Sequence, residues 1–339
     1  MGQDRTRLVD KVYDVRCPNC ALELPAADRT NPEVRYGDRI LVLKYLYLFQ
    51  EPRRWDVVVF KSPDDPAYQQ NFIKRLVGKP GESIMILDGD IYVGKGNDSG
   101  TYRIQSKPRY VQQDLWRNIY DNDHYPLGRV NRADPWRQPW GVADEHSGWS
   151  GLGTQRGQQR RVFAFDNMDG GSTIRFDPNA NQTNAFTDYL VYDLEEVQRV
   201  GARYRANPVS DLKLEFFYRR KAGDGPLRLR MTKGGDAFIT ELTPGRAKLI
   251  HERGVTSTVI GEAAISDQRA AVKVELTNHD YQVSLRIDDQ ELIRTTAEQY
   301  QPDVKSMLAQ HSAGRSGAMP TLQIAAQRQQ SQISHLKLA

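Results

Sequence analysis

The pattern that most constrains the fold is an alternation of polar and apolar residues, repeated in short segments along the second half of the chain. Residues 211–218 and 227–231 alternate in this way. Residues 273–277 and 281–287 also alternate, and they flank Asn278-His279-Asp280, which predicts a hairpin. Short alternating strands separated by turn residues are typical of a two-layer antiparallel β-sandwich. The sequence therefore predicts a mainly β fold.

Composition agrees with a folded chain and excludes one class of partner. The chain has 339 residues, enough for two domains, and 9% of them are aromatic, which is too many for a disordered polar chain. Its 47 basic and 43 acidic residues leave a formal charge of only +4. This balance argues against a nucleic-acid partner. No stretch approaches 18 uninterrupted apolar residues, so no transmembrane helix is expected in this segment.

Two further strands are predicted near the start of the chain. Residues 56–60 and 71–77 are both rich in β-branched and aromatic residues. The second run is followed by a turn, which is marked by Gly78, Pro80 and Gly81.

Lys74 is the candidate catalytic residue within the second run. In an extended strand Phe72, Lys74 and Leu76 share one face, whereas Arg75 points to the other. An ammonium held against apolar groups loses hydration, so the pKa of such a lysine falls. We therefore expect Lys74 to be able to act as a general base.

Four blocks of this region resemble the motifs of type I signal peptidases, which are membrane-bound serine proteases with a Ser/Lys dyad. The blocks are Gly37–Lys44, Asp56–Pro63, Phe72–Glu82 and Asp88–Val93. By this resemblance Lys74 is the general base. The supporting motif residues are Gly37, Asp38, Asp56, Arg75, Gly78, Pro80 and Gly81. Asp38 and Asp56 stand at strand starts, where a turn or pairing role is expected rather than a catalytic one.

The resemblance also implies an architecture and a location. Residues 1–35 are a leading segment, residues 36–115 a partial signal-peptidase-type β core, and residues 116–339 an inserted sandwich with a Trp-rich connecting region at 124–160. The sandwich resembles concanavalin A-like (laminin G-like) domains, and the arrangement resembles the large planctomycete-type signal peptidases. The resemblance implies signal peptides of secretory preproteins as substrates, no required cofactor, and a catalytic part on the outer (periplasmic) side of the cell membrane, at the membrane surface.

The family's serine is missing from its expected place. Residues 1–36 contain no serine, and the similar run Ser316–Leu322 has Ala318 where the nucleophile would stand. We therefore expect an internal piece of a longer membrane protease, truncated at both ends. The alternative is a catalytically inactive homologue, in which a glycan- or protein-binding sandwich sits on a degenerate protease scaffold.

The only two cysteines form the motif Cys17-Pro18-Asn19-Cys20. Its spacing fits half of a structural zinc site, but no second Cys-x-x-Cys or nearby histidine completes it. A redox-active disulfide and a remnant knuckle without a ligand remain as alternatives.

Overall fold

The structure is a computed structural model of the chain. It describes residues 39–62, 71–96, 98–124, 136–142, 147–153, 159–181, 186–187, 208–315 and 317–339. Strands dominate this part, so the prediction of a mainly β fold is confirmed. The helical segments are short: α2 (Leu46–Phe49), the 3₁₀ turn η2 (Ser99–Thr101), α3 (Arg109–Leu115) and α5 (Val304–Ser312).

The strands form three sheets. A hairpin contains β1 (Val57–Lys61) and β2 (Asn71–Arg75), and a three-stranded sheet contains β3 (Ser83–Leu87), β4 (Asp90–Gly94) and β5 (Arg103–Ile104). The 13-stranded sheet contains β6 (Tyr120–Asp121), β7 (Trp140–Val142), β8 (Trp149–Leu152), β9 (Gln159–Phe176), β10 (Leu212–Gly223), β11 (Leu227–Lys233), β12 (Asp236–Thr243), β13 (Arg246–Arg253), β14 (Thr256–Ala264), β15 (Val272–His279), β16 (Gln282–Ile287), β17 (Gln290–Arg294) and β18 (Leu322–Leu338).

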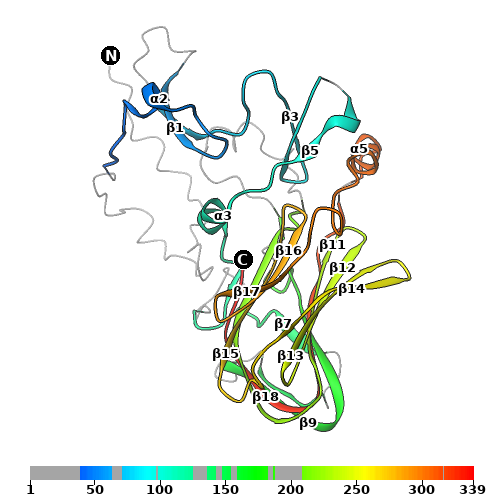
Figure 1. Cartoon of the computed structure of the whole chain (residues 1–339). Helices are drawn as coiled ribbons and strands as arrows, with labels where there is room; N and C mark the ends of the chain where they lie inside the picture. Colours follow the sequence, from blue (N-terminus) through cyan, green and yellow to red (C-terminus); the bar gives the residue numbers. More distant parts are fainter. Residues whose placement is uncertain are drawn as a thin grey trace, which may run out of the picture.

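The large sheet folds into two layers about its long central strand, β18 (Figure 1). One edge of β18 pairs first with β11 and then with β10, and its other edge pairs with β9 and β6. From β11 the sheet continues through β12, β13 and β14, and from β10 it continues through β15, β16 and β17. All these pairings are antiparallel, so the predicted antiparallel sandwich is confirmed.

The core lies between the two layers, where alternate residues of each strand point inward. In β11 the inward parity is held by Leu227, Leu229 and Met231, which are buried. The facing layer contributes buried residues such as Val274 and Leu276 from β15. This alternation is the pattern that the sequence displays, because successive side chains of a strand point to opposite faces.

Two details of the sandwich differ from the sequence-based expectation. Part of the region predicted as a Trp-rich connection forms strands β7 and β8, which pair with β9. Trp140 is fully buried in the core, because its large apolar surface favours burial over a loop position. The predicted hairpin turn at 278–280 also lies further along the chain. Strand β15 runs to His279, and the turn residues are Asp280 and Tyr281, both with positive φ.

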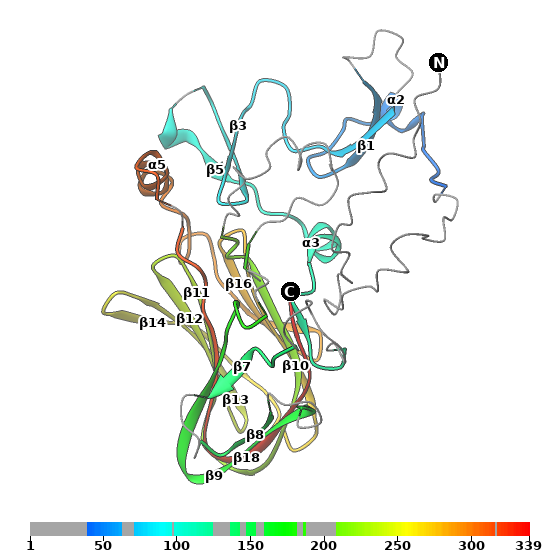
Figure 2. The same cartoon turned by 180° about the vertical axis from the view of Figure 1, so that it is seen from behind.

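The two small sheets lie at one end of the sandwich. In both views α3 lies between the β1–β2 hairpin and the sandwich, and the β3–β5 sheet lies near α5 (Figures 1 and 2). No helix in the described residues is long and apolar enough to cross a membrane.

Candidate active site

Lys74 lies on strand β2 of the hairpin, directly opposite Val58 of β1. Cross-strand partners point to the same face of a sheet, so Phe72 and its partner Phe60 share the face of Lys74. The Phe60 and Phe72 rings are 6.0 Å apart, and the Lys74 Nζ lies 5.9 Å from the centre of the Phe72 ring. The lysine therefore has the apolar neighbours that its strand parity predicts.

The expected desolvation of Lys74 is wrong for this arrangement. The Lys74 side chain is exposed, and so are Phe60 and Ile73 on the same hairpin. A two-stranded hairpin offers neighbours beside a lysine but no second layer above it, so water reaches the amine. Apolar neighbours on one strand face are not enough to bury an ammonium.

Arg75 points away from Lys74, as its parity predicts, and holds the hairpin in place. Its Nη1 donates a hydrogen bond of 3.0 Å to the carbonyl oxygen of Trp55, and its Nη2 lies 3.8 Å from an Asp114 carboxylate oxygen. Asp114 belongs to α3. Arg75 therefore connects the lysine-bearing hairpin to the helix beside the sandwich.

Asp56 organises the turn that begins the hairpin. Its carboxylate accepts a 2.8 Å hydrogen bond from the backbone N–H of Arg53 and a 3.2 Å hydrogen bond from the hydroxyl of Tyr47. The hairpin continues past its named strands, because the N–H of Leu76 donates to the Asp56 carbonyl oxygen. The expectation that Asp56 is a turn and pairing residue is confirmed.

The turn after β2 has the geometry that its glycines and proline predict. Gly81 has a φ of +78° and follows Pro80, the arrangement of a type II turn. Gly78 lies against Ile84, where an added Cβ would come within 2.9 Å of the Ile84 Cγ1. Both glycines are therefore required by the backbone path.

An ion pair fastens this turn to the start of β1. The Arg54 Nη2 donates a 2.6 Å hydrogen bond to Glu82, and the other Glu82 oxygen accepts from the Lys79 N–H at 2.7 Å. The hydrogen bond from Arg54 lowers the pKa of the Glu82 carboxyl.

The predicted site residues Gly37, Asp38, Cys17 and Cys20 lie outside the described residues.

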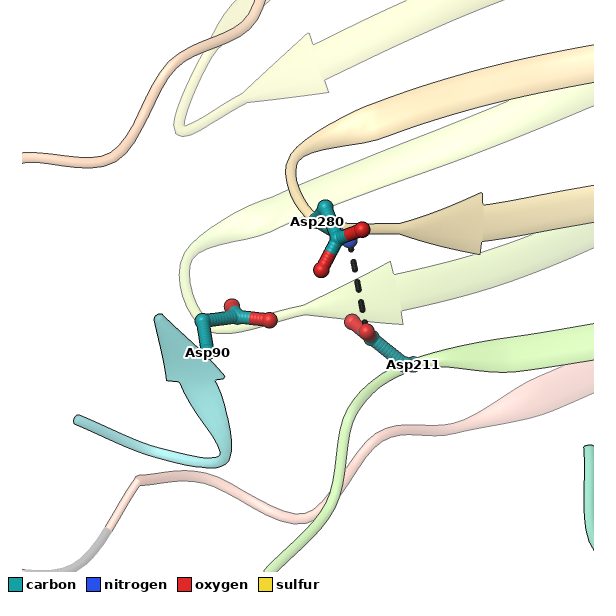
Figure 3. A group of neighbouring side chains, drawn as sticks. All are labelled: Asp90, Asp211 and Asp280. Atoms are coloured by element: carbon teal, nitrogen blue, oxygen red, sulfur yellow. Dashed lines mark hydrogen bonds between the residues drawn. The ribbon is translucent and has the colours of Figure 1, made fainter. Parts of the chain in front are cut away.

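A second cluster of charged groups was not predicted from the sequence. Asp90, Asp211 and Asp280 come from distant parts of the chain, and their carboxylates turn toward one another (Figure 3). The Lys233 Nζ lies 3.1 Å from an Asp90 oxygen and 2.6 Å from an Asp211 oxygen. Lys107 pairs with Asp280 through its ammonium, and its backbone N–H donates to the same carboxylate at 2.7 Å.

This cluster does not need a metal ion. Three carboxylates with oxygen atoms within 4.8 Å of one another could ligate a cation. Here the ammonium groups of Lys233 and Lys107 already supply the positive charge between them. The cluster is therefore a salt-bridge network that joins β4 and the segment after β5 to the sandwich.

One sequence signal could have revealed part of the cluster. Lys233 continues the parity of Leu227, Leu229 and Met231, which all point into the core. A lysine at a core position of an alternating strand predicts a buried charge with a partner. The identity of that partner could not be read, because Asp90 lies 143 positions away along the chain.

Comparison with known proteins finds a family similarity for the part of the chain that carries Lys74. Residues 27–143 match the family model described as "Signal peptidase, peptidase S26". Signal peptidase I of Leptolyngbya laminosa is 34% identical over 84 residues, which are 23% of this chain and 41% of that protein. Signal peptidase I of Rickettsia prowazekii is 29% identical over 148 residues, which are 43% of this chain and 53% of that protein.

The chain thus spans about half the length of these curated relatives, with shares of 41% and 53%. The resemblance to signal peptidases that the four sequence blocks indicate is confirmed for residues 27–143.

Comparison with solved structures finds distant likenesses, mainly to β-sandwich proteins. A carbohydrate-binding module from Bacillus subtilis covers 59% of this chain and 94% of its own, at 10% identity and a TM-score of 0.35. Sheep galectin-11 covers 39% of this chain and 92% of its own, at 6% identity and a TM-score of 0.27. The sandwich is defined here by its strand pairings, which these distant likenesses do not refine.

Proposed function

We propose that residues 36–115 are the lysine-bearing part of a serine endopeptidase that removes signal peptides from secretory preproteins. The observation that carries the proposal is the position of Lys74, at the centre of the hairpin within the matched residues 27–143. Its amine is exposed beside the apolar rings of Phe60 and Phe72, so a substrate or a nucleophile can approach it. The sandwich at 116–339 is an insert of this protease.

In the proposed mechanism Lys74 is the general base, and the nucleophile is the family's serine, which is missing from this chain. The neutral amine accepts the hydroxyl proton while the serine oxygen attacks the scissile carbonyl carbon, and the resulting ammonium gives that proton to the departing amine. Water then hydrolyses the acyl-enzyme. A lysine works this way only when it is shielded from water. We therefore propose that the segment carrying the serine, together with bound substrate, covers Lys74.

The region around the hairpin supports a site at the membrane surface. Leu41, Leu48 and Phe49 are among the most exposed large apolar residues of the described chain. Exposed apolar residues of this density favour contact with a lipid surface. We propose that they rest on the outer side of the cell membrane, where the signal peptides of translocated preproteins are presented.

Substitution of Lys74 by Met in the native gene product tests this function. Met keeps the length of the side chain and removes its proton-accepting amine, so cleavage of a secretory preprotein should fall by about a thousandfold or more. The matched control is Lys61→Met, an exposed lysine at the end of β1 on the same hairpin. Cleavage is followed by electrophoresis and by mass spectrometry of the released signal peptide.

The outcomes are distinct. Full activity of the Lys74→Met variant would contradict the assignment of the base, and equal loss in both variants would show an effect of hairpin charge instead. Failure of the unsubstituted gene product to cleave any preprotein would favour the alternative, a binding module on an inactive protease scaffold.

The zinc site at Cys17 and Cys20 stays a prediction, which metal analysis of the purified protein can check.

A further inference from the structure

The charged cluster lies at the junction between the signal-peptidase-like part and the sandwich. Asp90 begins β4, and Lys107 follows β5. Asp211 precedes β10, Lys233 ends β11, and Asp280 lies in the turn between β15 and β16. Four of the cluster's ion pairs and hydrogen bonds cross between the two parts: Lys233 to Asp90, Lys107 to Asp280 through both its ammonium and its backbone, and Lys107 to Asp211 at 4.0 Å.

A weaker contact also joins the two parts at this place. The hydroxyl of Tyr92 in β4 lies 3.9 Å from the sulfur of Met307 in α5. A contact to sulfur is weak compared with hydrogen bonds between charged groups. The charge state of the cluster therefore matters for the junction.

The cluster contains one carboxylate more than it has ammonium groups. Three ionised aspartates and two lysines carry a net charge of −1, whereas one bound proton makes the cluster neutral. Asp90 and Asp280 are each about 1% exposed and Lys233 is 6% exposed, while the side chains of Lys107 and Asp211 are 16% and 21% exposed. Water therefore screens the surplus charge only weakly. A buried site of this kind favours its neutral form.

We propose that this cluster is a proton-dependent latch, which holds the β3–β5 sheet firmly on the sandwich when it carries one proton and loosens when that proton leaves. Asp90 is the proton carrier. It contacts a lysine, whereas the other two carboxylates also accept hydrogen bonds from backbone N–H groups among the described residues. Asp211 accepts from the Asp280 N–H at 3.3 Å, and Asp280 accepts from the Lys107 N–H.

The electrostatics of Asp90 agree with this role. Burial, followed by the nearby charge of Asp211, raises the pKa of Asp90 to about 7. Lys233 and Lys107 act in the opposite sense, and Asp280 adds to the increase. The titratable groups that face this site from all the packed segments are Asp88, Tyr92, Lys107, Asp211, Lys233, His279, Asp280, Tyr281 and Tyr300.

The sign of the pH effect follows from these shifts. A carboxyl group whose pKa is raised in the docked form keeps a proton that the undocked form has released. Docking therefore weakens as pH rises from the ordinary aspartate range to about 7, by up to tenfold per pH unit, and is constant above that. Lys233 lowers the pKa of Asp211, against the effect of burial, and the resulting stabilisation is constant between pH 5 and 8.

His279 acts in the opposite direction and must be separated from Asp90. Burial lowers the pKa of His279, so its contribution to docking is lost as pH falls below its ordinary range. A comparison of two variants that both contain His279 cancels this contribution at every pH. The experiment therefore takes the ratio of the protection factors measured for the unsubstituted chain and for Asp90→Asn. The side chain at position 90 of this variant is a neutral amide at every pH.

The first measurement follows the titration in the unsubstituted chain, and the variant serves only to identify one signal. Carboxyl carbon chemical shifts of the whole chain, labelled with ¹³C-aspartate, are followed from pH 4 to 9, and the Asp90 signal is identified by its absence in Asp90→Asn. We expect one buried carboxyl to titrate near pH 7. Titration of every aspartate below pH 5 would overturn the proposal.

The second measurement links the proton to docking. Hydrogen exchange of the amides of β4 and of the turn at Asp280 is compared between the unsubstituted chain and Asp90→Asn at the same pH. The ratio of their protection factors should fall about 30-fold from pH 5.5 to pH 8, since 1.5 pH units lie below the titration point. Asp224→Asn makes the same chemical change at an exposed residue in the loop between β10 and β11, and its ratio should not change. A constant ratio for Asp90→Asn, or an equal change in both variants, would overturn the latch.

Discussion

At the scale of single residues, Arg220 shows how a charged side chain is accommodated in the sandwich core. Its side chain is fully buried, and it continues the inward parity of Phe216 and Tyr218 on β10. Its guanidinium donates to the carbonyl oxygens of Gly225 at 2.6 Å and Leu242 at 3.1 Å. Burial lowers the pKa of Arg220. The residue therefore donates to the carbonyl oxygen of a loop residue, Gly225, and to that of a strand residue, Leu242.

Replacing Arg220 with Met should destabilise the protein strongly. The substitution keeps much of the packing but removes the guanidinium donors to these buried carbonyl oxygens, at a cost of about 3 kcal/mol in the free energy of unfolding. Urea denaturation at neutral pH measures this value. Arg219→Met is the matched control, because the adjacent Arg219 is exposed and should cost less than about 1 kcal/mol. Equal losses would show that Arg220 has no special role.

At the scale of elements, the long strand β18 serves both layers because it is interrupted by irregular positions. Arg328 and His335 have positive φ angles, and the pairing register shifts near both residues. Such bulges bend a strand and increase its twist. The strand nevertheless continues from Leu322 to Leu338 as a single element.

Position 225, in the loop between β10 and β11, must be glycine because the loop passes close to the first of these bulges, at Arg328. A Cβ added to Gly225 would lie 1.8 Å from the carbonyl oxygen of Gln327, which is backbone and cannot move away alone. We expect Gly225→Ala to lower the free energy of unfolding by about 3 kcal/mol. Gly235→Ala is the control, because its added Cβ meets nothing within 4 Å. Thermal denaturation of the two variants compares them, and a Gly225→Ala variant as stable as Gly235→Ala would contradict the expected clash.

At the scale of the whole molecule, a buried salt-bridge network joins the signal-peptidase-like part to the sandwich. Lys233 is its centre, because it contacts Asp90 from one part and Asp211 from the other. Removing one member of a buried network is costly, since the remaining charges stay desolvated. The orientation of the Lys74 hairpin relative to the sandwich depends on this junction and on the Arg75–Asp114 contact.

Lys233→Met should therefore destabilise the protein in a pH-dependent way. At pH 8 the variant leaves ionised carboxylates buried without their ammonium, and we expect a loss of about 3–5 kcal/mol in the free energy of unfolding. At pH 5.5 the loss should be smaller, because a carboxyl group can neutralise itself by binding a proton. Urea denaturation at both pH values measures the difference. Lys248→Met, which removes a partly exposed partner of Glu262, should cost less than about 1 kcal/mol at either pH. A pH-independent loss for Lys233→Met would contradict the explanation.

The sequence by itself determined the local features of the protein. The alternation in segments such as 227–231 specifies strands with one buried face, because side chains alternate across a strand. Pro80 and Gly81 specify their turn through their own backbone preferences. The motif around Lys74 indicates a signal-peptidase-like segment. Each of these depends on residues that are neighbours in sequence.

Only the tertiary structure decided which distant residues meet. Trp140 becomes a core residue because β9 supplies a pairing edge, and the lysine at the end of β11 acquires Asp90 from another part of the chain. The same reason explains the error at Lys74. Strand parity gives the neighbours of a side chain on its own sheet, but burial depends on a covering layer, which only the packing of separate elements can provide.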